Sequence, residues 1–250
     1  EAEKQRPHPA GTALADVEFQ VFSQFGEDGI LQHLVHHVKP ANRTFVEFGV
    51  EDYTEANTRF LVRHDNWRGL VIDGSDQHIN TIKRDRLYAF HDLTAVAAFI
   101  DASNINSLIS SAGFSGPLGI LSVDIDGNDY WIWKAIEIIK PAIVVIEAKI
   151  EYGIQEVIVP YSIENNRNNN EMYNGASVKA FEKLGKRKGY KLVGANKQGY
   201  NLFFVRADAT YNASPAEALL ANINIQQCFY PNSFFNQYEF VTEKKKKNWN

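Results

Sequence analysis

The sequence predicts an α/β protein built on a doubly wound, mostly parallel sheet. Four apolar, β-rich runs alternate with helix-like segments: TFVEFGV (44–50), RGLVIDG (68–74), GILSVDI (119–125) and AIVVIEA (142–148). Strands that are apolar on both faces are typical of a parallel sheet that helices cover on both sides. A weaker fifth strand is expected at VAAFI (96–100), before a helix that starts at Ser103 and Asn104.

The end of the chain adds a different kind of strand pair. YKLVGA (190–195) and YNLFFVRA (200–207) are separated by the short turn 196–199, which makes the pair antiparallel. A five-stranded parallel sheet that ends in an antiparallel hairpin distinguishes S-adenosylmethionine-dependent methyltransferases from plain dinucleotide-binding folds. We therefore predict a Rossmann-like methyltransferase fold.

Length and composition are those of one main globular domain. The chain has 250 residues, of which 44% are hydrophobic and 22% charged. We expect an N-terminal extension over 1–20, a methyltransferase domain over 21–208, and a C-terminal extension over 209–250 that packs on or near the acceptor side. The loop 152–177, whose asparagine-rich part is expected to be mobile and to act as a lid, is predicted to shape the acceptor pocket.

Charge and cysteine usage exclude several classes of protein. The net charge is only -4, and apart from the run Lys244 to Lys247 the basic residues are dispersed, so nucleic acid is not an expected partner. The single cysteine, Cys228, leaves no internal disulfide and no cysteine-based zinc site. No apolar run approaches the roughly 20 residues that cross a bilayer. We expect a cytoplasmic protein without a membrane span.

The turn after the first strand indicates the type of cofactor. Ligands of open α/β sheets bind beyond the carboxyl ends of the strands, where this chain carries VEFGVEDYTEANT (46–58). The glycine-rich dinucleotide fingerprint is absent: only Gly49 is present, and Glu51 and Asp52 lie where a pyrophosphate would bind. Two carboxylates repel phosphate but suit the sulfonium and ammonium groups of S-adenosylmethionine. The sequence therefore favours that cofactor over NAD.

Other strand ends supply the remaining cofactor contacts. Asp73 ends the second strand and can accept hydrogen bonds from both ribose hydroxyls, or alternatively cap the next helix. Asp101 and Ala102 follow the third strand and are the expected neighbours of the adenine ring. Gln24 and Glu27, before the first strand, could contact the methionine end or only tie the N-terminal helix to the sheet.

Several fragments in a fixed order carry a family resemblance. They are SQFGEDGIL (23–31), FVEFGVEDYTEANT (45–58), GLVIDGS (69–75), SNINSLI (103–109), LSVDIDGNDYWIW (121–133), VVIEAK (144–149), YNGAS (173–177) and GYNLFFVR (199–206). From about residue 20 to 206 the chain resembles the FkbM-like methyltransferases. The resemblance implies an S-adenosylmethionine-dependent enzyme that commonly methylates hydroxyl groups of sugars or natural products. Tyr53 departs from the pattern, because relatives often carry a glycine there.

Together these observations define a predicted cofactor site for S-adenosylmethionine. Its residues are Gln24, Glu27, Glu47, Gly49, Asn57, Thr58, Asp73, Gly74, Ser75, Asp101, Ala102 and Asp124.

Acidic residues gather after the fourth and fifth strands. Asp124 and Asp126 are expected to point the same way because side chains alternate along a strand, and Glu147 ends the neighbouring strand about 4.8 Å away. Such carboxylates repel one another unless a positive group lies among them: the cofactor's sulfonium and ammonium groups, a divalent cation, or a lysine such as Lys149. Asp126, Asp129 and Glu147 are the predicted ligands of a Mg²⁺ or Mn²⁺ ion that activates the acceptor hydroxyl.

Histidines are further candidates for the general base or for metal ligands. In a metal-free mechanism Asp126 or His91 would act directly as the general base. His33, His36 and His37 have the i, i+3, i+4 spacing of a metal site, but a solvated helix face is the expected reading of that segment.

The sequence thus predicts an O-methyltransferase that acts on a hydroxyl of a saccharide, a nucleotide-sugar or a related natural product. The alternatives are an N- or carboxyl-methyltransferase and a non-catalytic methyltransferase-fold binding module. A small-molecule or saccharide acceptor is the expected partner. A homo-oligomer is a further possible assembly.

Overall fold

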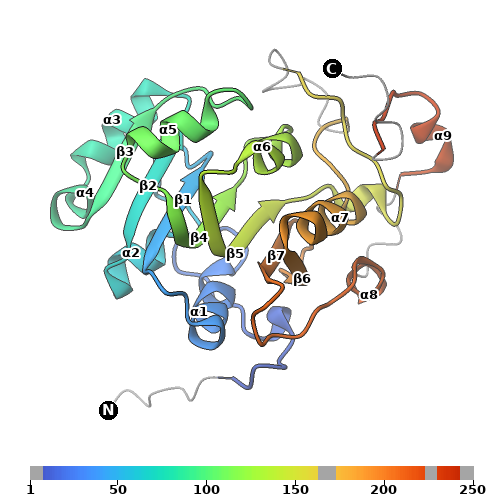
Figure 1. Cartoon of the computed structure of the whole chain (residues 1–250), viewed down its shortest axis with the longest axis horizontal. Helices are drawn as coiled ribbons and strands as arrows, with labels where there is room; N and C mark the ends of the chain where they lie inside the picture. Colours follow the sequence, from blue (N-terminus) through green and yellow to red (C-terminus); the bar gives the residue numbers. More distant parts are fainter. Residues whose placement is uncertain (1–7, 163–172, 223–229, 243–250) are drawn as a thin grey trace.

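The computed structural model describes residues 8–162, 173–222 and 230–242 (Figure 1). A seven-stranded sheet runs in the order β3-β2-β1-β4-β5-β7-β6. The strands are β1 (Thr44–Phe48), β2 (Arg68–Asp73), β3 (Leu93–Ala97), β4 (Gly116–Val123), β5 (Ile139–Glu147), β6 (Tyr190–Ala195) and β7 (Asn201–Arg206). The first five are parallel, and β7 is antiparallel to both β5 and β6. The predicted fold class is confirmed.

Helices cover both faces of this sheet (Figure 1). One face packs against α1 (Glu27–Val38), α2 (Arg59–Asp65), α3 (Asp76–Arg84) and α4 (Arg86–Phe90). The other packs against α5 (Ile105–Ser111), α6 (Asp129–Ala135), α7 (Val178–Lys188) and α8 (Ala216–Asn222). Short helices η1 (Leu14–Asp16), η2 (Ile150–Tyr152) and α9 (Asn232–Phe235) lie in the connections.

Strand β5 shows why the apolar runs do not alternate with polar residues. Ile143 and Val145 are buried in the core on the α1 face, whereas Val144 and Ile146 are buried in the core on the α6 face. A strand covered on both faces needs apolar side chains at every position. The polar residue that ends such a run, Glu147 in β5, lies at the carboxyl end of its strand.

The third strand differs from its predicted position. It spans Leu93–Ala97 and not 96–100, with Leu93 and Ala95 buried. The apolar run was misleading because Phe99 lies beyond the strand with 72% of its surface exposed.

The two predicted extensions both contact the main domain. Leu14 and Val17 are buried in the core, and a Cβ atom added to Gly194 would lie 2.5 Å from Leu14, so the chain joins the core before residue 21. In the C-terminal part, Val241 pairs with Ile158, in the segment that follows β5 and η2. The domain limits themselves stay predictions.

Some predictions fall outside the described residues. These include the lid at 164–172, Cys228 and the lysine run 244–247. Among the helices of the described segments, none combines the length and apolarity needed to span a bilayer.

Candidate functional site

The loops after β1 and β4 touch at the carboxyl edge of the sheet. Gly49 has a left-handed backbone (φ 70°), and a Cβ atom there would lie 1.6 Å from the carbonyl oxygen of Asp124. No other residue type allows this approach without displacing one of the loops. The contact brings Asp124 directly beside the turn that was predicted to hold the cofactor.

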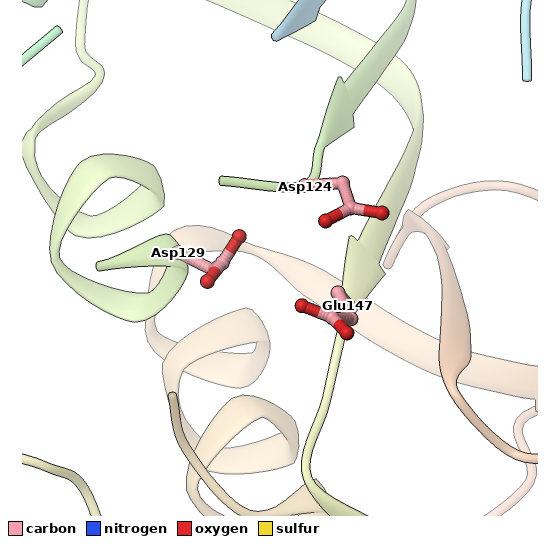
Figure 2. Close-up of side chains that lie close together, drawn as sticks. All are labelled: Asp124, Asp129 and Glu147. Carbon is pink, nitrogen blue, oxygen red and sulfur yellow. The ribbon is translucent and has the colours of Figure 1, made fainter. Parts of the chain in front are cut away.

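Three acidic side chains converge at this edge. Figure 2 shows Asp124, Asp129 and Glu147 pointing toward one another, and each offers a carboxylate oxygen within 4.8 Å of the others. Asp124 follows β4, Asp129 begins α6, and Glu147 ends β5. Within the described segments, this is the one group of three or more potential metal-ligating side chains found.

Burial makes these acids reluctant to ionise. It raises the pKa of Asp124 well above its usual range, and the charge of Glu147 raises it further. Burial, followed by the charges of Asp129 and Asp126, raises the pKa of Glu147 to about 8, although Lys149 partly offsets the rise. A cation among the carboxylates would remove this repulsion.

Asp129 also shapes the loop that precedes α6. Its Oδ1 accepts a hydrogen bond from the Ile125 N–H at 2.8 Å, and its Oδ2 accepts one from the Gly127 N–H at 2.9 Å. Burial raises the pKa of Asp129 to about 6 against the opposing effect of these bonds. A carboxylate oxygen has further lone pairs, so both bonds are compatible with binding a cation.

Asp126, a predicted metal ligand and base, is not among the three converging acids. Asp124 and Asp126 were expected to point the same way because side chains alternate along a strand. That alternation stops before them, because β4 ends at Val123. Asp126 instead adopts a left-handed backbone (φ 56°) and its side chain is exposed. Asp124, predicted as a cofactor residue, takes its place beside Asp129 and Glu147.

Glu47 makes structural hydrogen bonds in the interior of the protein. It is 3% exposed, and burial raises its pKa. Its carboxylate accepts hydrogen bonds from the N–H groups of Asn57 at 2.9 Å and Thr58 at 3.2 Å, and from the hydroxyls of Thr58 and Ser122. Glu47, Asn57 and Thr58 therefore clamp the loop after β1 to the sheet.

Tyr53 lies in that same loop with a left-handed backbone (φ 64°). This conformation explains why a glycine is expected at its position. Its ring is fully buried, and its hydroxyl lies 2.8 Å from the Thr58 hydroxyl. These contacts hold a conformation that a tyrosine otherwise disfavours.

Asp73 connects two loops at the end of β2. It accepts hydrogen bonds from the N–H groups of Glu51 at 2.9 Å and Ser75 at 2.8 Å, and its Oδ1 lies 3.1 Å from His78 Nδ1. The cap of α3 is the Ser75 side chain rather than Asp73. At Gly74 a Cβ atom would lie 2.8 Å from the ring of Phe99, which places an exposed aromatic ring at this strand end.

The predicted adenine neighbours are engaged within the chain. Asp101 Oδ1 accepts hydrogen bonds from the N–H groups of Ser103 at 2.7 Å and Asn104 at 2.9 Å. The Ala102 N–H donates to the Tyr161 hydroxyl at 3.1 Å. Sequence reasoning missed Tyr161, because no local signal relates the segment after β5 to the loop after β3.

Gln24 and Glu27 differ from each other. Gln24 is exposed, on a loop held against the β1 loop by the bond from the Ala56 N–H to the Phe22 carbonyl. Glu27 is fully buried. Its carboxylate accepts hydrogen bonds from the Phe25 N–H and from the side chains of Asn196 and Asn201, which corresponds to the structural alternative.

The candidate histidines lie away from the acids. His91 precedes β3, at the amino end of a parallel strand, so it is on the opposite edge of the sheet from Glu147. His33 is 7% exposed and its Nε2 lies 2.9 Å from the Tyr211 hydroxyl, so the expected solvated face was wrong for this residue. Burial lowers the pKa of His33 to about 4.

Comparisons with known proteins find no matching family model and no matching curated protein. The resemblance to FkbM-like methyltransferases therefore stays a prediction.

Similar solved structures include an O-methyltransferase from Bacillus cereus in complex with S-adenosylhomocysteine, 15% identical, covering 76% of this chain and 83% of that chain, with a TM-score of 0.45. An S-adenosylmethionine-dependent methyltransferase from Clostridium acetobutylicum is 10% identical, with coverages of 71% and 88% and a TM-score of 0.44. Geranyl diphosphate C-methyltransferase from Streptomyces coelicolor is 10% identical, with coverages of 72% and 78% and a TM-score of 0.47. All three are distant in sequence and in coordinates.

Proposed function

We propose that this protein transfers a methyl group from S-adenosylmethionine to a hydroxyl of a saccharide, a nucleotide-sugar or a related natural product. The convergence of Asp124, Asp129 and Glu147 at the carboxyl edge of the sheet is the observation that carries the proposal. The cofactor would lie over the ends of β1 and β2, and the acceptor over the ends of β4 and β5.

The charge of the cofactor side supports a cationic ligand. Hydrogen bonds from the Thr54 hydroxyl and N–H lower the pKa of Asp52, so the turn after β1 carries a negative charge. That charge opposes a pyrophosphate and favours a sulfonium. Asp73 Oδ2 accepts one bond, from the Glu51 N–H, and retains a lone pair for a ribose hydroxyl. The exposed ring of Phe99 offers an apolar surface for an adenine.

The donor set on the acceptor side fits a divalent cation. Oxygen ligands alone suit Mg²⁺, Mn²⁺ or Ca²⁺ better than zinc. In our proposal Asp124, Asp129 and Glu147 hold the ion, which when bound would lower the pKa of the acceptor hydroxyl. The exposed Asp126, on the adjoining loop, would accept the hydroxyl proton, and His91 has no part because it lies at the other edge.

The segments beyond β5 would border the acceptor. Trp131 Nε1 donates to the Val159 carbonyl at 2.9 Å, and the Trp131 and Tyr161 rings meet edge to face with centroids 6.1 Å apart. Val241 is paired to Ile158 in the same segment. We therefore propose that the segment around Val159 and Tyr161 forms one wall of the acceptor pocket.

Calorimetry tests the cofactor assignment. We expect S-adenosylhomocysteine to bind and NAD to fail, and Asp73→Ala to weaken S-adenosylhomocysteine binding about tenfold through loss of a ribose acceptor. Asp76→Ala is the matched control, because Asp76 is an exposed acid three residues away. Equal affinity in wild type and Asp73→Ala would remove Asp73 from the site.

A transfer assay tests the acceptor class. Radiolabelled S-adenosylmethionine is incubated with saccharides, nucleotide-sugars, amines and carboxylic acids. Label on a hydroxyl is the expected result, and label on an amine or carboxyl instead would replace the proposed acceptor.

A further inference from the structure

We propose that Asn201 supplies a fourth, neutral oxygen ligand to the cation held by Asp124, Asp129 and Glu147. This inference rests on the cation site of the proposed function. It adds a residue from β7, the antiparallel strand, to a set that otherwise comes from the end of β5 and the loop after β4.

The strand register puts Asn201 next to Glu147. The two residues are direct partners in the antiparallel pairing of β5 with β7. The neighbouring position carries the backbone hydrogen bond, from the Ala148 N–H to the Tyr200 carbonyl at 2.8 Å. Glu147 and Asn201 therefore form a non-hydrogen-bonded pair, in which Cα atoms are about 4.5 Å apart and the side chains share one face of the sheet.

Glu27 determines which way the Asn201 amide faces. Glu27 Oε1 accepts a hydrogen bond from Asn201 Nδ2 at 2.8 Å and another from Asn196 Nδ2 at 2.8 Å. A carboxylate can only accept from these groups, so the reversed amide would set two oxygens against each other. Asn201 Nδ2 is thus fixed toward Glu27, and Oδ1 lies on the other side of the amide.

The order of the strands bears on the direction of the Asn201 amide oxygen. Asn196 follows β6, and the strands lie in the order β5-β7-β6, so Glu27 bridges β7 to the end of β6. In our proposal the Asn201 oxygen faces β5, the strand that pairs with β7 and ends at Glu147. Oδ1 is buried without a hydrogen-bond partner among the described residues, and Asn201 as a whole is 7% exposed.

A buried carbonyl oxygen without a partner has lost its hydrogen bonds to water and gained none in return, which destabilises the fold. The chain retains one on the residue paired with Glu147, one of the three converging acids, and in our proposal a hard cation binds all four groups. A neutral oxygen adds coordination without adding to the repulsion among the acids, and six to eight oxygens are the usual number around Ca²⁺.

Mn²⁺ titration of the intact protein tests the proposal. Asn201→Ala should weaken Mn²⁺ binding about tenfold or more, as loss of a supporting group at a metal site commonly does. Asn196→Ala is the control: it removes the companion bond to Glu27 and the acceptor of the Asn201 N–H but leaves Asn201 Oδ1 in place, and should change the affinity less than about threefold. Equal effects of the two substitutions, or no effect of Asn201→Ala, would overturn the inference.

Other outcomes separate this inference from the proposed function. If the wild-type protein binds no Mn²⁺, both the proposed cation site and the proposed role of Asn201 in it are refuted. If Asn201→Ala does not fold, the wild-type protein with ¹³C-labelled asparagine decides: saturating Mg²⁺ should shift the Asn201 Cγ resonance and leave that of Asn196 nearly unmoved. An unmoved Asn201 resonance at saturation would refute the fourth ligand while leaving the three acids in place.

Discussion

The two halves of the carboxyl edge use their acids in different ways. At the ends of β1 and β2, Glu47 and Asp73 are hydrogen-bonded to backbone N–H groups and hydroxyls of the adjoining loops. At the ends of β4 and β5, Asp124 and Glu147 face each other and Asp129. In the first half, backbone and hydroxyl donors hold both acids, whereas in the second half Asp129 alone of the three accepts hydrogen bonds from the described residues.

From this difference we infer two roles: Glu47 and Asp73 hold loops in place, and the acids at the ends of β4 and β5 bind a ligand. Carboxylates that converge on one another repel when ionised, so we infer that their convergence marks a place where a cation can bind. The pKa values support a cation site as well. Burial raises the pKa of all three acids, and neighbouring carboxylates raise it further, Asp126 being the neighbour that acts on Asp129.

Asp124→Asn should give the largest effect. In our account it removes a charged cation ligand, so turnover should fall about a thousandfold, or about 4 kcal/mol of transition-state stabilisation. The same substitution relieves repulsion with Glu147, so the melting temperature without cations should rise. Activity near that of the wild type, with an unchanged melting temperature, would show that the two halves do not differ.

Gly49→Ala tests the contact that joins the two halves. The added Cβ would meet the Asp124 carbonyl at 1.6 Å on a left-handed backbone, so we expect a loss of about 3 kcal/mol in the free energy of unfolding. Gly189→Ala is the control, with a similar φ (84°) but nothing within 4 Å of the new Cβ, and should lose about 1 kcal/mol. Urea denaturation measures both, and equal losses would mean that the loop contact is not tight.

The pH dependence of stability gives a smaller effect. The pKa of Glu147 is raised to about 8 in the folded protein, so the folded state binds a proton more tightly than the unfolded one. This stabilisation is full below the unfolded pKa, near 4.3, and is lost as pH rises through about 8. Without cations the melting temperature of the wild type should therefore fall by a few degrees relative to Glu147→Gln between pH 5 and pH 8.5.

The comparison with Glu147→Gln is needed because His33 acts in the opposite direction. Its lowered pKa, about 4, makes stability fall as pH drops below the usual histidine range. Both proteins carry His33, so its contribution cancels, and the difference between them reports Glu147 together with its effect on Asp124. Saturating Mg²⁺ should reduce that difference, and parallel melting curves across the pH range would count against a buried, repelled Glu147.

Parts of the molecule could be predicted from sequence because they depend on local patterns. Apolar runs such as 142–148 and the hairpin turn at 196–199 define the sheet directly. The choice of acids depends on where β4 ends, at Val123, and on the left-handed backbone of Asp126, neither of which has a clear local signal. Asn201 depends on strand register and on a contact with Glu27, 174 residues away, so no local pattern could reveal its role.

Anomalous diffraction tests the central claim most directly, because it needs no knowledge of the acceptor. Crystals of the protein with S-adenosylhomocysteine are soaked in Mn²⁺, and data are collected at the manganese edge. We predict S-adenosylhomocysteine over the ends of β1 and β2, with an anomalous peak among Asp124, Asp129 and Glu147. Bound S-adenosylhomocysteine without a peak among these acids at saturating Mn²⁺ would contradict the account.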